Sequence, residues 1–150
     1  MSDVTPSLSA SLPPSDPASL PSGLPPSGFP SAEPVIRTIA MPADTNPAGD
    51  IFGGWLMAQM DLAAGNLAAR LAKGRAATIA VDGMTFLKPV KVGDEVSLYA
   101  RLDHQGRSSM RIHVEAWRRD RYATEAIRVT EALFTFVAID AEGRPRPISG

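Results

Sequence analysis

The segment DTNPAGDIFGGWLMAQMD, residues 44–61, ends on Asp61, a carboxylate within a helical run that is otherwise rich in methionine, alanine and glycine. A carboxylate in apolar surroundings costs free energy unless it is paired or used in chemistry. On a helical wheel at about 100° per residue, every neighbour within about 60° of Asp61 lacks a polar side chain. These neighbours are Gly54, Met57, Ala58, Ala64, Gly65, Ala68 and Ala72, whereas the polar residues Gln59, Asn66 and Arg70 lie on the opposite side. The pattern predicts that Asp61 is buried and points away from solvent.

Two interpretations of this carboxylate are open. Asp61 could be a structural residue that pairs with an arginine or a backbone donor, or it could act as a general base or nucleophile. Buried ion pairs stabilise a fold weakly compared with apolar replacements. The small neighbours Ala58, Ala64 and Gly65 leave space for a ligand, although small residues also allow a helix to pack closely on a sheet. The placement favours a functional carboxylate.

Gly53 and Gly54 open the same helix. The first backbone N–H groups of a helix have no intrahelical partner and lie at the positive end of its dipole. Glycine allows another group to approach that backbone closely, so a carbonyl oxygen that gains negative charge could be held there, as in an oxyanion hole. A Gly-Gly pair is more often only a turn. Together with an acid about two turns, or about 10 Å, further along the helix, the pair favours acyl-transfer chemistry.

Hydrophobic periodicity predicts the elements that would position these groups. A short strand is expected over residues 34–42, a turn-rich loop over 44–50, and one long helix over 53–74 that ends at Lys73 and Gly74. Four strands are expected over residues 77–89, 94–103, 110–117 and 125–140, followed by coil. The order β-α-β-β-β-β predicts an α+β domain with one long helix laid across an antiparallel sheet.

Composition limits the classes of function. The chain has 150 residues, enough for one domain, and no cysteine, which excludes disulfides, thiolate catalysis and cysteine zinc sites. Its net charge of −1 argues against general nucleic-acid binding, and no apolar run is long enough to span a membrane. The N-terminus lacks the basic and apolar regions of a secretory signal. We therefore expect a cytoplasmic protein.

Residues 1–34 differ in composition from the rest of the chain. They hold nine of the 14 prolines, with serine in most of the gaps and no lysine or arginine. Such a segment cannot bury enough apolar surface to offset its ordering entropy, so a disordered tail is expected. A polyproline ligand for an SH3-type domain is the alternative. The expected organisation is a tail over residues 1–34, a folded domain over 35–147 and a C-terminal coil over 148–150.

Three segments carry a resemblance to a known family: MPADTNPAGDIFGGWLMAQMD, VDGMTFLKPVKVGD and VTEALFTFVAID. Together they resemble the hotdog-fold acyl-CoA thioesterases, in particular the small bacterial type called YciA-like acyl-CoA hydrolases, over about residues 35–147. The resemblance implies a hotdog fold, in which a five-stranded antiparallel sheet wraps around one long helix. It also implies a homo-oligomer, at least a dimer with a continuous sheet and often a trimer of such dimers, with active sites at the dimer interface. Pro47 and the proline-rich extension depart from the family pattern.

The resemblance assigns roles to the N-terminal motif. It implies that Asp61 is the essential carboxylate and that the amide of Gly54, beside Gly53, polarises the thioester carbonyl. Asn46 matches an asparagine that, in double-hotdog relatives, helps to position water or substrate from the partner subunit. An alternative role for Asn46 is that of an Asx-turn residue before Pro47.

Loop residues supply candidate contacts to CoA. The turn HQGRSS offers Arg107, Ser108 and Ser109, and Lys88 lies beside Pro89 at the end of the predicted strand over residues 77–89. Arginine and lysine suit phosphate groups, and serine hydroxyls suit the pantetheine arm. Surface loops often contain such residues without any ligand.

The predicted reaction is hydrolysis of an acyl-CoA thioester to a free acid and CoA, with no cofactor beyond the substrate. No metal is expected, because His104 and His113 lie in a turn and a strand without ligand spacing. A hotdog hydratase would need a catalytic histidine near the helix, and residues 35–102 contain none. A non-catalytic hotdog protein that only binds or scaffolds acyl-CoA is the other alternative. The acyl chain length is not predicted.

Overall fold

The computed structural model describes residues 33–148. The predicted tail lies almost entirely outside these residues, as do residues 149 and 150, so the predictions for both segments stay predictions. The described elements are β1 (Ile36–Ile39), η2 (Pro42–Asp44), α1 (Gly53–Ala72), β2 (Ala76–Phe86), β3 (Glu95–Gln105), β4 (Ser109–Arg119) and β5 (Ala126–Ala138). Their order confirms the predicted succession of strands and helix, with one added 3-10 turn.

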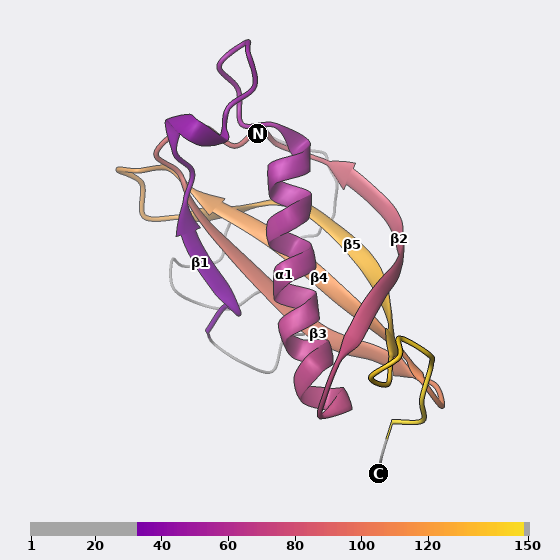
Figure 1. The fold of residues 1–150 in the computed structure, drawn as a ribbon. Coiled ribbons are helices and arrows are strands. Elements are labelled where there is room, and N and C mark those ends of the chain that lie inside the picture. The colour runs from indigo at the N-terminus through magenta and orange to yellow at the C-terminus, as the bar shows by residue number, and fades with distance from the viewer. Residues whose placement is uncertain (1–32, 149–150) are drawn as a thin grey trace.

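All five strands form a single antiparallel sheet in the order β1-β3-β4-β5-β2. The helix α1 lies lengthwise across one face of this sheet (Figure 1). This arrangement confirms the expected α+β architecture. Within the described residues, no helix is long and apolar enough to cross a membrane.

The first strand is shorter than the sequence pattern predicted. It ends at Ile39, because Pro42 begins η2 three residues later. A carboxylate oxygen of Asp44 accepts a hydrogen bond of 2.9 Å from the N–H of Met41, which closes this turn. The chain therefore leaves the sheet early and forms the loop that leads to α1.

The core lies between α1 and the inward-facing residues of the central strands. Alternation along β3 and β4 brings Leu98, Ile112 and Val114 to full burial. The helix contributes Leu56, Met60, Ala63, Ala64, Ala68 and Ala72. Four of these six residues are alanines, which allows the helix axis to approach the sheet closely. Toward the end of β3, Leu102 is 36% exposed, at the point where the register with β4 shifts.

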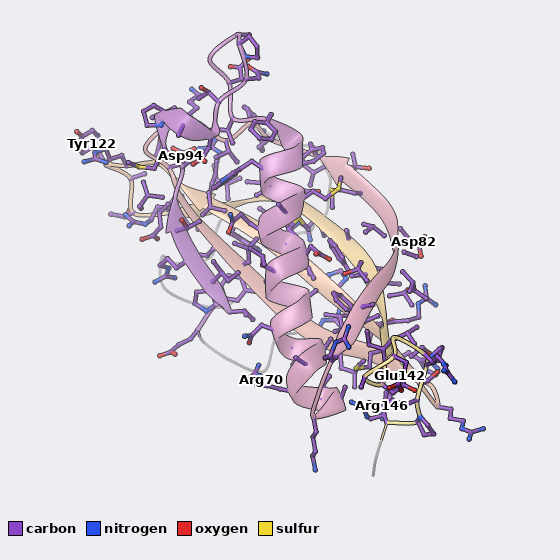
Figure 2. The ribbon with its side chains drawn as sticks, viewed as in Figure 1. Arg70, Asp82, Asp94, Tyr122, Glu142 and Arg146 are labelled. Atoms are coloured by element: carbon purple, nitrogen blue, oxygen red, sulfur yellow. The ribbon has the colours of Figure 1, made fainter. Side chains whose placement is uncertain are left out.

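The strand β2 is the last strand on its side of the sheet. Among the described residues no further strand pairs with its outer edge. Its pairing with β5 shifts register twice, and the second shift, between Asp82 and Thr85, contains Gly83 at a φ of 64°. Figure 2 shows Asp82 on the outer side of β2, away from α1. Most of the strand is exposed, including the apolar side chain of Ile79 at 60%.

The C-terminus of α1 falls where the sequence predicted, at Lys73 and Gly74. The residue in the left-handed conformation is Lys73, however, with φ 53° and ψ 43°. The N–H of Gly74 donates to the carbonyl of Ala69 at 3.1 Å, which closes the last turn. A lysine in this conformation is strained, because its Cβ lies close to the backbone.

Replacing Lys73 with glycine is expected to stabilise the fold by up to about 1 kcal/mol. Relief of the left-handed strain outweighs the larger backbone entropy of glycine in the unfolded chain. Urea unfolding of the wild type and Lys73→Gly measures the difference. Arg70→Gly, one turn earlier on the exposed face of α1, is the control and should cost about 1 kcal/mol. Equal losses in the two variants would contradict a left-handed Lys73.

Candidate active site

Asp61 lies in the third turn of α1 and is bound by a residue of the edge strand. The hydroxyl Oγ1 of Thr78, on β2, lies 2.6 Å from Oδ1 of Asp61 and donates a hydrogen bond to it. The bond restricts the rotamer of the carboxylate and leaves Oδ2 available for a second donor. Thr78 was not among the site residues that the sequence indicated. Its only signal is its place next to a register shift between β2 and β5, which cannot be seen in the residue pattern.

The prediction that Asp61 is fully buried and points away from solvent is wrong for the single chain. Asp61 is half-buried, its predicted neighbour Met57 is 40% exposed, and the next residue along the helix, Leu62, is 60% exposed. The predicted neighbour Ala58 is exposed too, whereas Ala64 and Ala68 are buried. The helical wheel recorded which residues are apolar, but it could not record that β2 is the last strand of the sheet. Asp61 therefore lies at the boundary between the core and an open apolar surface.

The start of α1 presents backbone donors without a side-chain cap. Phe52 is the N-cap residue and makes no capping hydrogen bond through its side chain. Gly53 and Gly54 follow in the first turn, where N–H groups have no intrahelical acceptor. Both glycines are exposed, so a ligand could reach their amides. The spacing from Gly54 to Asp61 along the helix is about 10 Å.

Asn46 organises the loop that precedes α1. Its Oδ1 accepts hydrogen bonds from the N–H groups of Ala48 at 3.0 Å and Asp50 at 3.1 Å. Its own N–H donates to the Asp50 carbonyl at 2.7 Å. This is the Asx-turn role that the sequence left open. The loop projects beyond the N-terminal end of α1 (Figure 1). Since the turn occupies Oδ1, only the side-chain NH₂ of Asn46 is available to a substrate or water.

The candidate CoA contacts lie near opposite ends of the helix α1. Lys88 follows the end of β2, where the Phe86 ring lies close to Gly53 at the start of α1. At the other end of the helix, Arg107 and Ser108 lie in the β3–β4 turn and Ser109 begins β4. There the Arg107 carbonyl accepts from the N–H of Ile148 at 2.9 Å, and Arg146 bonds the last turn of α1 (Figure 2). With 20 residues, α1 is about 30 Å long, so these groups do not surround one ligand within one chain.

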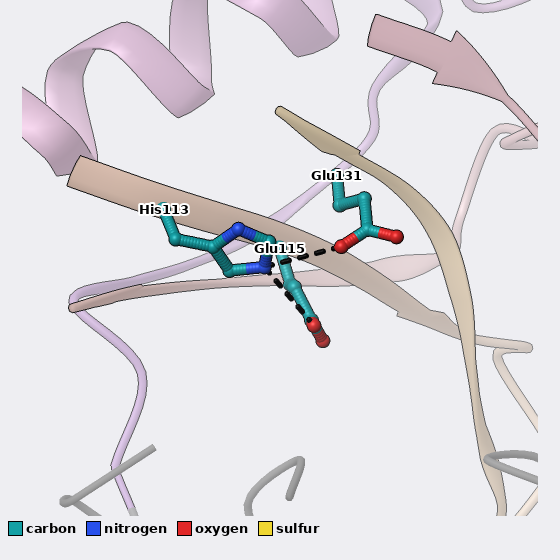
Figure 3. A group of neighbouring side chains, drawn as sticks. All are labelled: His113, Glu115 and Glu131. Carbon is teal, nitrogen blue, oxygen red and sulfur yellow. Dashed lines mark hydrogen bonds and ion pairs between the residues drawn. The ribbon is translucent and has the colours of Figure 1, made fainter. Parts of the chain in front are cut away.

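A second cluster of ionisable groups lies on the outer face of the sheet (Figure 3). Nε2 of His113 lies 3.1 Å from Oε1 of Glu131 and 3.4 Å from Oε2 of Glu115. Arg128 lies 3.5 Å from both carboxylates, and the indole N–H of Trp117 donates to Glu115 at 2.8 Å. Hydrogen bonding to Glu115, and then to Glu131, raises the pKa of His113 to about 9. Hydrogen bonding by His113 in turn lowers the pKa of Glu131.

His113 has two potential metal ligands as neighbours in space, although the spacing of residues along the sequence predicted no metal site. Ligand atoms of His113, Glu115 and Glu131 lie within 4.8 Å of one another. Linear spacing did not reveal this, because Glu131 comes from the neighbouring strand. An imidazole with a pKa near 9 is protonated at neutral pH and is a donor rather than a ligand. With Arg128 balancing the second carboxylate, the cluster is an ion-pair network.

The His113 network is expected to make stability depend on pH. A folded-state pKa of about 9, above the ordinary histidine value of 6.5, gives stabilisation that is complete below pH 6.5 and is lost as the pH rises to 9. Its size is at most about 3 kcal/mol. The measurement is the difference in unfolding free energy between the wild type and His113→Gln from pH 6 to 9.5. His104→Gln, in the exposed end of β3, is the control. A difference that stays constant or grows with pH would contradict the assignment.

Comparison with known proteins places this geometry in a family. The thioesterase superfamily pattern matches residues 48–125. Over 123 residues the chain is 53% identical to the acyl-CoA thioester hydrolase YciA of Salmonella typhimurium, covering 79% of this chain and 92% of that protein. A hexameric thioesterase from Yersinia pestis is 53% identical with a TM-score of 0.75, covering 79% of this chain and 96% of the other. A hexameric hotdog fold thioesterase of Campylobacter jejuni is 42% identical with a TM-score of 0.73, covering 78% and 90%.

The sheet that wraps a single helix, with an acid and open amides on that helix, defines a hotdog-fold thioesterase. The chain belongs to the thioesterase superfamily and, within it, to the acyl-CoA thioester hydrolases of the YciA type. This confirms the family that the three sequence motifs indicated.

Proposed function

We propose that this chain hydrolyses acyl-CoA thioesters to a free carboxylic acid and CoA. The observation that carries the proposal is the carboxylate of Asp61, which accepts a hydrogen bond from Thr78 of β2. Asp61 lies on α1, the helix whose first-turn amides have no side-chain cap. Membership of a family of acyl-CoA thioester hydrolases supports the same substrate class. CoA enters as part of the substrate, and the mechanism needs no other cofactor.

The N–H of Gly54 would hold the thioester oxygen and stabilise the negative charge that develops there. With Oδ1 engaged by Thr78, Oδ2 of Asp61 is the oxygen that faces the reaction. As a general base it takes a proton from a water molecule, whose oxygen attacks the carbonyl carbon. The C–S bond then breaks, and the CoA thiolate takes up a proton. As a nucleophile, Asp61 would instead attack the carbonyl itself, and water would hydrolyse the resulting anhydride.

Asn46 is the third residue of the proposed site. An acyl-CoA hydrolase from Staphylococcus aureus is 33% identical over 77% of this chain, with TM-scores of 0.71 and 0.70 for two of its variants. These two variants replace an asparagine and an aspartate, fifteen positions apart, with alanine. Asn46 and Asp61 have the same separation. The two hydrogen bonds of the Asx turn hold the Asn46 side chain in the loop and leave its NH₂ group available to donate. This suits a residue that positions water or the thioester.

The open side of β2 supports a homodimer in which two sheets join edge to edge. An exposed edge strand of 11 residues with unpaired backbone groups is a template for pairing with a second chain. Such pairing would cover the exposed apolar residues Ile79 and Leu62 and would shield Asp61 from bulk water. The hexameric relatives from Yersinia pestis and Campylobacter jejuni support three such dimers in one assembly.

Oligomerisation also allows the separated CoA candidates to serve one substrate. Lys88 would contact CoA bound at the α1 start of its own chain. Arg107, Ser108 and Ser109, about 30 Å away along α1, would act on CoA bound to another chain of the assembly. We place the enzyme in the cytoplasm, because the absence of cysteine suits a reducing compartment.

Asp61→Asn is expected to lower kcat for acyl-CoA hydrolysis by at least about 10²-fold, because the amide can neither accept a proton from water nor act as a nucleophile. The assay measures free CoA thiol from acetyl-, butyryl-, octanoyl- and palmitoyl-CoA. Asp103→Asn, which alters an exposed carboxylate on β3, is the matched control and should retain activity. Size-exclusion chromatography checks that the assembly is intact. Turnover at the wild-type rate in Asp61→Asn would contradict this role of Asp61. CoA release no faster than background in the wild type would favour a non-catalytic binding protein.

Thr78→Val is expected to lower kcat by about tenfold or more with a smaller change in KM. Valine keeps the shape of the side chain but removes the donor to Asp61, so the carboxylate loses its fixed orientation. Thr78→Ser, which keeps the hydroxyl, should restore most of the activity. A structural role for Thr78 in β2 alone would predict the reverse order, with the β-branched valine active and serine impaired.

A further inference from the structure

Two aromatic rings lie against the glycines that open α1. A Cβ atom built on Gly53 would lie 3.1 Å from Cζ of Phe86, and a Cβ atom built on Gly54 would lie 3.3 Å from Cδ2 of Phe52. Phe52 precedes the helix, whereas Phe86 is the last residue of β2. The rings therefore come from two separate segments and flank the first-turn amides. A side chain at either position would press on the neighbouring ring, which would have to shift by a few tenths of an ångström.

The backbone on both sides of Phe86 is held in place. Oγ1 of Thr130 donates to the carbonyl of Thr85 at 2.6 Å, and the N–H of Leu87 donates to the carbonyl of Val129 at 2.7 Å. These bonds attach the end of β2 to β5 immediately before and after Phe86. The backbone that carries the Phe86 ring is thus held by the sheet next to the start of α1.

The rings form part of an accessible apolar surface. In the single chain Phe86 is 46% exposed, Phe52 is 41% exposed, and Met57, one helical turn further on, is 40% exposed. We call these three residues the ring surface. Their side chains offer no hydrogen-bond donors for phosphates or for the pantetheine amides, whereas a hydrocarbon gains free energy by covering them. An acyl group therefore matches the ring surface better than CoA does.

We propose that Phe86 determines which acyl groups this chain hydrolyses. This inference rests on the proposed function, in which the N–H of Gly54 holds the thioester carbonyl. Carbons next to a carbonyl bound there lie within reach of the ring that rests on Gly53. A straight chain passes the edge of the Phe86 ring, whereas a branch or an aryl group on the first carbons needs the space that the ring occupies.

The test compares kcat/KM for butyryl-, isobutyryl- and benzoyl-CoA in the wild type and Phe86→Ala. Removal of the ring should raise the benzoyl-to-butyryl ratio by about tenfold or more, since the fit of a few carbons in an apolar pocket is worth that much. The isobutyryl-to-butyryl ratio should rise as well. Phe86→Trp should lower both ratios. Leu87→Ala, at the neighbouring and similarly exposed position, is the matched control and should leave both ratios unchanged.

The outcomes separate this inference from the proposed function. A wild-type protein that releases no CoA from any thioester overturns both. Active wild type with unchanged ratios in Phe86→Ala overturns only the role of Phe86. A uniform rise in KM for every substrate would place the ring against the pantetheine arm and also overturn it. Equal ratio changes in Phe86→Ala and Leu87→Ala would do the same, because they would reflect general loosening of the end of β2.

Discussion

The hydrogen bond from Thr78 to Asp61 joins the helix to the edge strand at the centre of the proposed site. Asp61 lies on a half-open side of α1, where an aspartate without a partner would sample several rotamers. A bond of 2.6 Å to a strand residue restricts the carboxylate to one orientation and leaves one oxygen for chemistry. This geometry holds only if β2 keeps its register against β5, so the edge of the sheet is part of the site.

The same edge accounts for the apolar surface that the single chain exposes. Ile79 on β2 and Leu62 on α1 are each 60% exposed, and burying such a side chain completely is worth roughly 1.5–3 kcal/mol. Pairing of two copies along β2 would recover part of this free energy. It would also lower the effective dielectric around Asp61, which strengthens every electrostatic interaction with a bound thioester. Stability of the assembly and catalysis would then depend on one surface.

The two faces of the sheet carry different kinds of side chain. The inner face packs apolar side chains against the alanine-rich side of α1, while the outer face carries the network of His113, Glu115, Arg128 and Glu131. Alternation along β4 puts His113 and Glu115 on the same face, two residues apart. That proximity was readable in the sequence. The contribution of Glu131 was not, because it depends on the pairing of β4 with β5.

Periodicity, together with the glycine and proline positions, determined one long helix, the succession of strands along the chain and the antiparallel α+β class. The family was indicated separately, by the resemblance of three motifs. Periodicity also singled out Asp61 and the glycine pair, since both belong to one continuous helix whose geometry is known in advance. Only the tertiary structure decided that Thr78 meets Asp61, that the Phe86 ring rests on Gly53, and that Asp61 lies at an open boundary. These contacts join residues on different elements, and they depend on the register shifts of β2 and on its position at the sheet edge. A local pattern of apolar and polar residues specifies neither, because register and strand order come from packing between distant segments.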